Sequence, residues 1–537
     1  MNPKKHQDNF ASEHLPPRSE WPEFIFDLPQ LHYPSTLNCA QELLKSAALY
    51  PAKTALIGSD LILSYAQLQA QVNQISHVLR DQMQLIPGNR VLLRGENHPM
   101  LLACILAVWQ VGCIAVPGMP MLRAKELGVM SEHAQISAAL CSVELKEDLL
   151  IAQNQHPILQ KIIYYGAQNK EDEACLEFLM KQKSTEFTPH ETHRDDVCLI
   201  SFTSGTTGIP KATAHFHRDV MAICDCFPVS TLHSCADDIF IGTAPLAFTF
   251  GLGGLALFPL RVGATAVLLE KYNPESLLQA IQQYKASICF TVPTFYRQMT
   301  KLACQFDLTS LRKTVSAGET LSIATRNAWQ HATDLRMIDG LGTTEMLHIV
   351  ISAAGKDIRP GAIGKVIPGY QACVLDENDR PVATGVVGRL AVKGPTGCRY
   401  LADSHQTNYV RNGWNVTGDM VAMDDDGYVW YHARADDLII SSGYNIAAAE
   451  VEEVLLQHPM VKECAVTGVM DEDRGQIVKA FVVLRFDFKA DENTVSILQR
   501  YVKEIIAPYK YPRVIEFIDS LPRTDSGKLQ RFKLRNG

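Results

Sequence analysis

The sequence lacks the features that mark several classes of protein. Its 14 cysteines contain no C-x-x-C pair, and the only close pair, Cys224 and Cys226, is not part of a metal-site pattern. Lysine and arginine (50) are outnumbered by aspartate and glutamate (58), so the net charge of −8 gives no reason to expect nucleic acid as a partner. The polar start MNPKKHQDNF does not resemble a secretory signal. We therefore expect free thiols and a cytoplasmic protein.

One long stretch lacks charge altogether. Residues 99–122 carry no formal charge, and their length would suit a membrane span. However, Gln110, Gly112, Pro117 and Pro120 interrupt the run, and irregular backbone facing lipid is energetically costly. The stretch therefore predicts a buried helix followed by a strand, and no membrane span.

The composition is that of a globular protein, with 47% hydrophobic and 20% charged residues in a chain long enough for two or more domains. Apolar strand-like runs alternate with helical patterns between residues 90 and 165, and again between 265 and 317. This alternation predicts an α/β fold with largely parallel strands. Proline and aromatic residues in the first forty positions predict an irregular arm. Short strands and Gly/Asp turns from about residue 360 predict a small β-rich subdomain. The mixture of helical and strand-like runs past 436 predicts a compact α+β unit.

The stretch SFTSGTTGIPKAT, residues 201–213, combines hydroxyl residues, two glycines and one lysine. Glycine and small hydroxyl residues suit a loop whose backbone approaches a phosphate, and a lysine adds a positive charge. The pattern is not the P-loop G-x-x-x-x-G-K-[ST], because Pro210 precedes Lys211 and Ala212 follows it. Taken alone, the stretch fits a phosphate-gripping loop and a polar surface turn equally well.

Four further motifs follow this loop in order. They read DGLGTTEML (339–347), GWNVTGD (413–419), HARADDLIISSGYNIAAAEVEE (432–453) and LPRTDSGKLQR (521–531). Together the five resemble the core motifs of the adenylate-forming superfamily, which comprises acyl- and aryl-CoA ligases, stand-alone adenylation domains and firefly luciferase. The resemblance runs from about residue 50 to the end of the chain.

The resemblance implies a large N-terminal domain, residues 1–435, of layered α/β subdomains plus a small β-rich subdomain, and a small mobile α+β lid, residues 436–537. It also implies a two-step reaction. A carboxylic acid, ATP and Mg²⁺ give an acyl-AMP and pyrophosphate, and the acyl group then passes to the thiol of coenzyme A or of a carrier protein's phosphopantetheine. Because two anions must meet at the α-phosphorus, catalysis should depend on positioning and charge stabilisation.

Carried over position by position, the motifs assign nucleotide-binding residues. Those expected to grip the phosphates are Thr203, Ser204, Gly205, Thr206, Thr207 and Gly208. Those expected around the adenine are Ser316, Ala317, Gly318, Glu319, Asp339, Gly340, Leu341, Gly342 and Thr343, with Asp339 accepting from the amino group. Asp419 should accept two ribose O–H bonds, and Arg434 should contact ribose or phosphate.

The resemblance also assigns catalytic residues. Glu345 should hold Mg²⁺ with Thr344 beside it, and Lys211 should steady the loop or the pyrophosphate. Lys528 should bridge the α-phosphate and the substrate carboxylate, and Asp436 should be the hinge of the lid. The residues expected to line the tunnel for the thiol after the lid rotates are Ser442, Gly443 and Tyr444.

The sequence departs from the family pattern at three positions. Leu341 replaces the aromatic residue that stacks on adenine, Ala212 replaces the glycine after P-K, and Ala433 replaces the glycine before the lid arginine. None of these changes removes a charged catalytic group, so we expect the chain to be active.

The segment APLAFTFGLGGLALFPLRVGATAVLL, residues 244–269, with GTTEMLHI resembles the benzoate–CoA ligase branch, and the N-terminal arm resembles 2-aminobenzoate–CoA ligase. A flat aromatic acid fits an aromatic slot, and Thr249 could accept a hydrogen bond from a ring amino group. We expect Phe248 to be a packing residue. The positions carried over to the acid pocket are Thr249, Phe250, Gly251, His348 and Ile349.

Two other functions stay open at this point. The chain could activate an aliphatic or aryl acid and load it onto an acyl carrier protein, since coenzyme A and the carrier's phosphopantetheine present the same thiol. It could also be a nucleotide-binding protein that has lost catalysis, although Glu345, Asp419, Arg434 and Lys528 argue against this. A homodimer is a further expectation.

Overall fold

The computed structural model describes residues 6–166, 175–203, 210–434, 438–441, 444–471, 475–506, 510–523 and 529–535. The chain divides into two compact units. Unit 1 comprises Met1–Ala372 and Val392–Asn415, and unit 2 comprises Cys373–Ala391 and Val416–Gly537.

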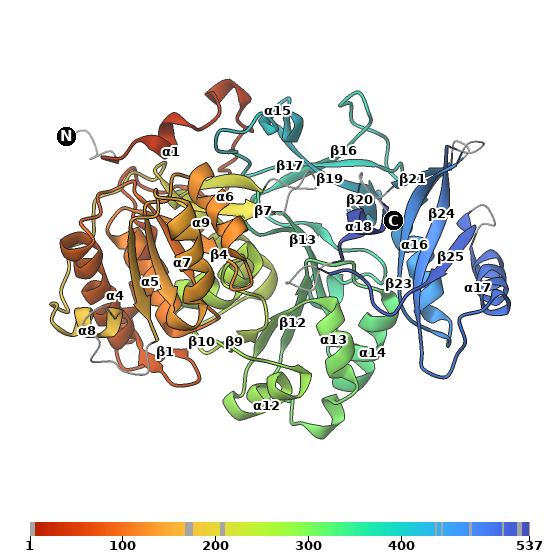
Figure 1. Ribbon diagram of the computed structural model, residues 1–537, viewed down its shortest axis with the longest axis horizontal. Coiled ribbons are helices and arrows are strands. Elements are labelled where there is room, and N and C mark those ends of the chain that lie inside the picture. The colour runs from red at the N-terminus through yellow and green to blue at the C-terminus, as the bar shows by residue number, and fades with distance from the viewer. Residues whose placement is uncertain are drawn as a thin grey trace. The chain divides into compact units, whose positions relative to one another are not determined.

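The first sheet of unit 1 has six strands in the order β6-β5-β3-β4-β7-β8. Its strands are β3 (Arg90–Arg94), β4 (Ile114–Gly118), β5 (Ala138–Ser142), β6 (Lys161–Tyr165), β7 (Val197–Thr203) and β8 (Lys211–Phe216). All neighbouring pairs are parallel except β7 and β8, which are antiparallel. The predicted parallel α/β arrangement is therefore confirmed (Figure 1).

The uncharged stretch of residues 99–122 forms α5 (Pro99–Gln110), every residue of which is buried, followed by the buried strand β4. The predicted helix and strand are thus confirmed. None of the helices in the described ranges is long and apolar enough to cross a membrane. Helices α6 (Ala124–His133) and α7 (Lys146–Gln155) contribute Leu127, Met130 and Leu149 to the core beneath this sheet.

The second sheet of unit 1 has nine strands in the order β15-β14-β13-β12-β11-β9-β10-β1-β2. Its strands are β1 (Thr54–Ile57), β2 (Ile62–Ser64), β9 (Ile239–Gly242), β10 (Thr265–Val267), β11 (Ile288–Thr291), β12 (Lys313–Ala317), β13 (Ile338–Gly342), β14 (Ile349–Ser352) and β15 (Lys365–Val366). Helices α12 (Pro274–Tyr284), α13 (Pro293–Thr300) and α14 (Ile323–Thr333) lie beside the β9–β13 part of the sheet (Figure 1). Tyr296 and Trp329 pack in the core between them with ring centroids 5.0 Å apart.

The register of this sheet brings two predicted motifs together. Strands β12 and β13 are parallel, with Ser316 opposite Asp339 and Ala317 opposite Gly340. Strand β14 then runs antiparallel to β13. The residues between β13 and β14 are the TTEMLH segment, so the sheet edge presents both motifs at the ends of neighbouring strands.

Residues 6–38 form the described part of the predicted arm, and its helical turns are short: α1 (Phe10–Glu13), η1 (Arg18–Glu20) and η2 (Pro29–Leu31), before α2 (Cys39–Leu43) begins. Trp21 and Phe24 pack on the guanidinium of the fully buried Arg399, whose Cζ lies 5.5 Å and 4.8 Å from the two ring centroids. The arm is therefore part of the core of unit 1.

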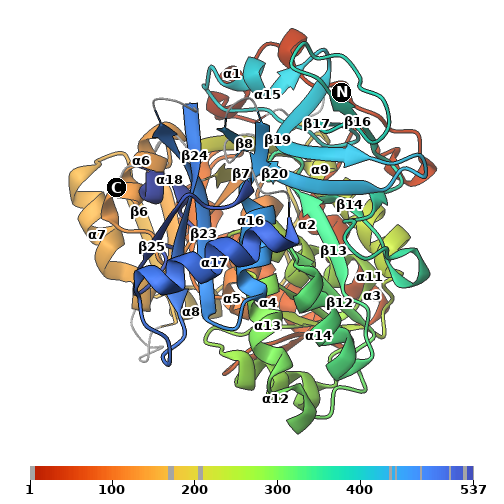
Figure 2. The same ribbon diagram turned by 90° about the vertical axis from the view of Figure 1, so that its right-hand side faces the viewer.

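The short strands predicted from the Gly/Asp turns have most of their residues in unit 2 and are β16 (Gln371–Leu375), β17 (Gly388–Lys393), β19 (Trp414–Met423) and β20 (Val429–Arg434). A separate sheet contains β21 (Leu438–Ser441), β22 (Tyr444–Ala447), β23 (Val461–Asp471), β24 (Gly475–Leu484) and β25 (Val514–Phe517). Helices α16 (Ala448–Gln457) and α17 (Glu492–Ile505) lie on the same side of this sheet, in front of β23 (Figure 2). Val451, Leu498 and Val502 form the core between them and the strands.

Candidate active site

Glu345 lies in the turn between β13 and β14 and is only 8% exposed. The hydroxyl of Tyr400 donates to its Oε1 at 2.6 Å. Burial and the charge of Glu345 raise the pKa of Tyr400 well above its usual range, so the phenol stays a donor. Carboxylate and hydroxyl oxygens are the donors that Mg²⁺ prefers, so this side chain fits the predicted metal role.

The turn that carries Glu345 is held by its neighbours. Thr343 Oγ1 lies 2.9 Å from the hydroxyl of Tyr409 and accepts from the backbone N–H of Met346 at 3.2 Å. Leu347 adopts a left-handed φ of 70°, and its N–H donates to the carbonyl of Thr344 at 3.1 Å. The tight turn fixes where the Glu345 carboxylate points.

Lys211 begins β8 directly opposite Thr203 at the end of β7. Its Nζ lies 5.5 Å from the ring centroid of Tyr400, the same side chain that holds Glu345. Tyr400 therefore connects the end of the predicted phosphate loop to the predicted metal ligand. Sequence reasoning missed Tyr400, because its segment GCRYLAD matches none of the motifs.

A fully buried charged pair supports this region. Arg399, next to Tyr400, donates to Asp219 Oδ2 at 2.7 and 2.8 Å. His215 Nδ1 lies 4.0 Å from the same oxygen, and burial, with the nearby Arg399, lowers the pKa of His215 to about 3. The histidine is therefore neutral, and the aspartate is balanced by Arg399 and by Arg218, whose Nε lies 3.9 Å from Asp219 Oδ1.

Asp339 is buried at the end of β13, where the backbone N–H of Gly340 donates to its Oδ1 at 3.0 Å. Burial raises the pKa of Asp339 to about 7, against the opposing effect of Arg326, whose guanidinium lies 3.5 Å away. Opposite it, the buried Oγ of Ser316 has no hydrogen-bond partner among the described residues. The unpartnered hydroxyl of Ser316 and the neighbouring carboxyl group of Asp339 fit the polar edge of a purine base.

The turn after β12 contains the other residues predicted around the adenine. Gly318 has a φ of +86°, which favours glycine, and the Glu319 carboxylate accepts from Thr294 N and Oγ1 at 3.2 and 2.7 Å. Glu319 thereby stabilises the start of α13. Because its side chain is used there, the backbone of the turn is the part that would contact the adenine base. Leu341 is half-buried in β13 opposite Ile351, so an aliphatic side chain stands where the family pattern has an aromatic one.

Two of the residues predicted for the acid pocket, Phe250 and His348, lie together, and two further phenylalanines pack on the His348 ring. Its ring centroid lies 5.8 Å from that of Phe250, 4.6 Å from Phe258 and 5.6 Å from Phe227. Burial lowers the pKa of His348 to about 3, and both ring nitrogens lack a hydrogen-bond partner within the described part of the chain. We call His348 and these three phenylalanines the His348 cluster.

The other members of the predicted pocket frame this cluster. Thr249 begins α10 (Thr249–Leu252), and both Thr249 and Phe250 are half-buried. Gly251 faces the carbonyl oxygen of Pro245, which a Cβ would approach to 2.1 Å, so this glycine permits a close backbone contact. Ile349 lies over Gly340 of the neighbouring strand, linking this region to the predicted adenine strand.

Unit 2 carries the predicted ribose residues. Asp419 in β19 is paired with Arg434 in β20, and the guanidinium donates to Asp419 Oδ1 at 3.1 Å. Asp419 is 3% exposed, and its Oδ2 has no hydrogen-bond partner among the residues that the structure describes. A carboxylate with one oxygen held and the other free to accept suits a ribose hydroxyl.

Several predicted residues cannot be placed. Those outside the described residues are Ser204, Gly205, Thr206, Thr207, Gly208, Asp436, Ser442, Gly443 and Lys528. Tyr444 is placed only by its backbone, at the start of β22.

Comparison with known proteins identifies the family. The family model of the AMP-binding enzymes matches residues 43–400, and that of the AMP-binding enzyme C-terminal domain matches residues 450–528. A benzoate–CoA ligase of Thauera aromatica is 34% identical over 519 residues, covering 95% of this chain and 97% of the relative. The human mitochondrial acyl-coenzyme A synthetase ACSM3 is 31% identical over 490 residues, covering 89% and 84%.

Solved structures agree. The anthranilate CoA ligase AuaEII in complex with anthranoyl-AMP superimposes with a TM-score of 0.89 at 31% identity, covering 95% of this chain and 98% of that one. A benzoate CoA ligase from Burkholderia xenovorans LB400 gives a TM-score of 0.83 at 28% identity, covering 93% and 99%. The predicted large N-terminal and small C-terminal domains are thus confirmed as the family's arrangement. The chain is a member of the AMP-binding enzyme family, within the adenylate-forming superfamily.

Proposed function

We propose that the protein is an AMP-forming acid–thiol ligase that joins an aryl acid of the benzoate or 2-aminobenzoate type to coenzyme A. The reaction has two steps, formation of an acyl-AMP with release of pyrophosphate and transfer of the acyl group to the thiol. Support for the reaction class comes from the family and from relatives named as CoA ligases. The names of AuaEII and of the two benzoate–CoA ligases support an aryl acid.

The observation that carries the choice of acid is the His348 cluster. It combines flat aromatic side chains with one neutral imidazole, neither nitrogen of which has a side-chain partner among the residues that the structure describes. Aromatic rings favour edge and offset contacts with another ring, and a polar group placed among them orients it. An aryl acid satisfies both features, and Thr249 is proposed to accept from a ring amino group.

Two buried oxygens without a hydrogen-bond partner among the described residues, Ser316 Oγ and Asp419 Oδ2, support the nucleotide roles. We assign the adenine to Ser316 and Asp339, the ribose to Asp419 with Arg434, and the pyrophosphate end to Lys211 and Thr203. Bound at Glu345 beside Thr344, Mg²⁺ would offset the phosphate charge. Lys528 is proposed to neutralise the reacting anions, and the lid of residues 436–537 is proposed to turn about Asp436.

An acid-panel assay tests this function. The full chain with MgATP and coenzyme A is given benzoate, 2-aminobenzoate and straight-chain acids of matched size, and both pyrophosphate and thioester are measured. We expect kcat/KM for the aryl acids to exceed that for the aliphatic acids by about tenfold or more, since one missing contact shifts discrimination by ~1–3 kcal/mol.

Other results would overturn parts of the proposal. A preference for aliphatic acids would remove the aryl assignment. Thioester formed only on a purified acyl carrier protein would replace coenzyme A as the acceptor. No pyrophosphate from any acid would remove the ligase assignment itself.

A further inference from the structure

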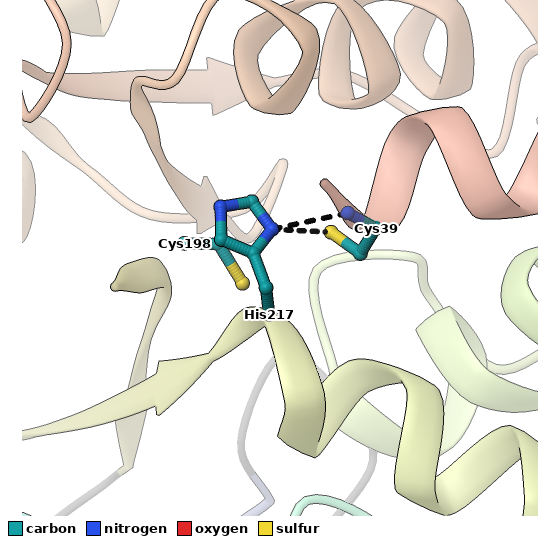
Figure 3. Close-up of side chains that lie close together, drawn as sticks. All are labelled: Cys39, Cys198 and His217. Carbon is teal, nitrogen blue, oxygen red and sulfur yellow. Dashed lines mark hydrogen bonds between the residues drawn. The ribbon is translucent and has the colours of Figure 1, made fainter. Parts of the chain in front are cut away.

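Three metal-ligand side chains from distant parts of unit 1 meet in its core (Figure 3). Cys39 is the first residue of α2, Cys198 lies in β7, and His217 begins α9 (His217–Phe227). Each is 0% exposed, and one ligand atom from each lies within 4.8 Å of the others. The proposed reaction uses none of them.

The donors and acceptors in this group do not match one to one. His217 Nδ1 lies 3.2 Å from the backbone nitrogen of Cys39 and 3.1 Å from its Sγ (Figure 3). A backbone N–H only donates, so Nδ1 must be the accepting nitrogen, and the thiol competes for the same lone pair. The other ring nitrogen, Nε2, is buried without a partner in the described part of the chain.

The backbone around the group is fixed before any ligand binds. Asn38 caps α2 through its Oδ1, and its Nδ2 donates to the carbonyl of Trp109 at 2.8 Å. The indole N–H of Trp109 in turn donates to the carbonyl of Cys198 at 2.7 Å. One tryptophan thus positions both cysteine-bearing segments, as a preorganised site requires.

We propose that Cys39, Cys198 and His217 form a binding site for one thiophilic divalent metal ion of the Zn²⁺ class. Two thiolates and an imidazole are a donor set that zinc prefers, and three protein ligands leave one position for water. Zn–S and Zn–N bonds of about 2.3 and 2.0 Å in tetrahedral geometry separate the ligand atoms by roughly 3.5–3.8 Å. Small side-chain shifts from the present arrangement reach these separations.

Charge favours a divalent ion. Two thiolates cancel the charge of Zn²⁺, and a fully buried site tolerates a neutral complex far better than a charged one. Because all three side chains are enclosed, the ion would have a structural role.

Cobalt titration of the reduced full chain tests the proposal. We expect one equivalent of Co²⁺ to give a thiolate-to-cobalt charge-transfer band and the visible bands of a tetrahedral ion, both lost when Zn²⁺ is added. Cys39→Ser and Cys198→Ser should each weaken the charge-transfer band by about half or abolish it. His217→Gln should keep the band and weaken metal affinity at least tenfold.

Cys289→Ser is the matched control, because this thiol is equally buried, has a pKa raised by burial to about 12, and lies in β11 away from the three ligands. Zinc should raise the melting temperature of the wild type and of this control but not that of the two cysteine variants. A wild type without a charge-transfer band, or a band that survives both Cys39→Ser and Cys198→Ser, would overturn the site. So would a Cys39–Cys198 disulfide that forms readily while metal does not bind.

Discussion

The hydroxyl of Tyr400 holds one oxygen of Glu345 at 2.6 Å while its ring faces Lys211. One side chain therefore influences two predicted catalytic groups of opposite charge. A hydrogen bond to a charged group contributes about 1.5–3 kcal/mol, and its loss also leaves a buried oxygen unsatisfied.

Tyr400→Phe keeps the ring and removes only the donor. We expect kcat/KM for ATP in pyrophosphate release to fall about 10–100-fold, with a higher Mg²⁺ requirement, because Glu345 loses its orientation. Tyr409→Phe is the control, since it removes a hydroxyl that contacts Thr343 in the same turn. Equal effects of the two substitutions would contradict the special role of Tyr400.

Asp339 gives a second residue-scale prediction, on stability against pH. Its folded-state pKa of about 7 lies above the usual ~3.9 of an unfolded aspartate, so its contribution to stability is fully present below about pH 4. That contribution is lost as the pH rises through 7, because the unfolded chain then ionises more easily. Asp339→Asn should therefore show a smaller fall in melting temperature between pH 5.5 and 8 than the wild type does, without ligands. A steeper fall in the variant would show that the Arg326 pair dominates.

At the scale of elements, the π-helical segment η6 (Gly253–Leu257) continues α10 and packs against the His348 cluster. A Cβ on Gly253 would lie 2.4 Å from the His348 ring, and one on Gly254 would lie 2.5 Å from the Phe290 ring. These glycines let the segment approach the rings closely, so a single methyl group changes the shape of the proposed acid site.

Gly253→Ala should lower kcat/KM for aryl acids at least tenfold with little change in KM for ATP, because the methyl group displaces the imidazole. Overpacking should also cost about 1–3 kcal/mol of stability. The combined Gly253→Ala, His348→Ala variant removes the clash, so its melting temperature should be no lower than that of His348→Ala alone. A lower value in the double variant would mean that the methyl group clashes elsewhere.

Elements with a strong local pattern were predictable from the sequence. Helix α17 begins after the capping Asp491 and spans residues 492–505, as its amphipathic run predicts, and the β–α alternation of both large sheets was also readable. The contacts of Tyr400 and Arg399 were not predictable. Glu345 lies 55 residues from Tyr400 along the chain and Asp219 lies 180 residues from Arg399, and no local periodicity encodes such contacts. The π-helical turn η6 was missed for the related reason that tertiary packing of glycines creates it.

At the scale of the whole molecule, two half-reactions are proposed to share one site through movement of the lid. Lys528→Ala should abolish formation of acyl-AMP and spare thioester formation from supplied acyl-AMP, since the charge is needed only when two anions meet. Single-turnover measurement of each half-reaction checks this. An equal loss in both would reject the two-state lid.

The packing of Trp21 and Phe24 on Arg399 has a consequence for biosynthesis. Phe24 is made 375 residues before its partner, a delay of roughly 20–75 s at about 5–20 residues per second. During that interval Trp21 and Phe24 lack the guanidinium that they cover in the folded protein. We therefore expect these rings of the arm to stay uncovered until Arg399 has emerged, so that this part of the core of unit 1 forms only after residue 399 has been made.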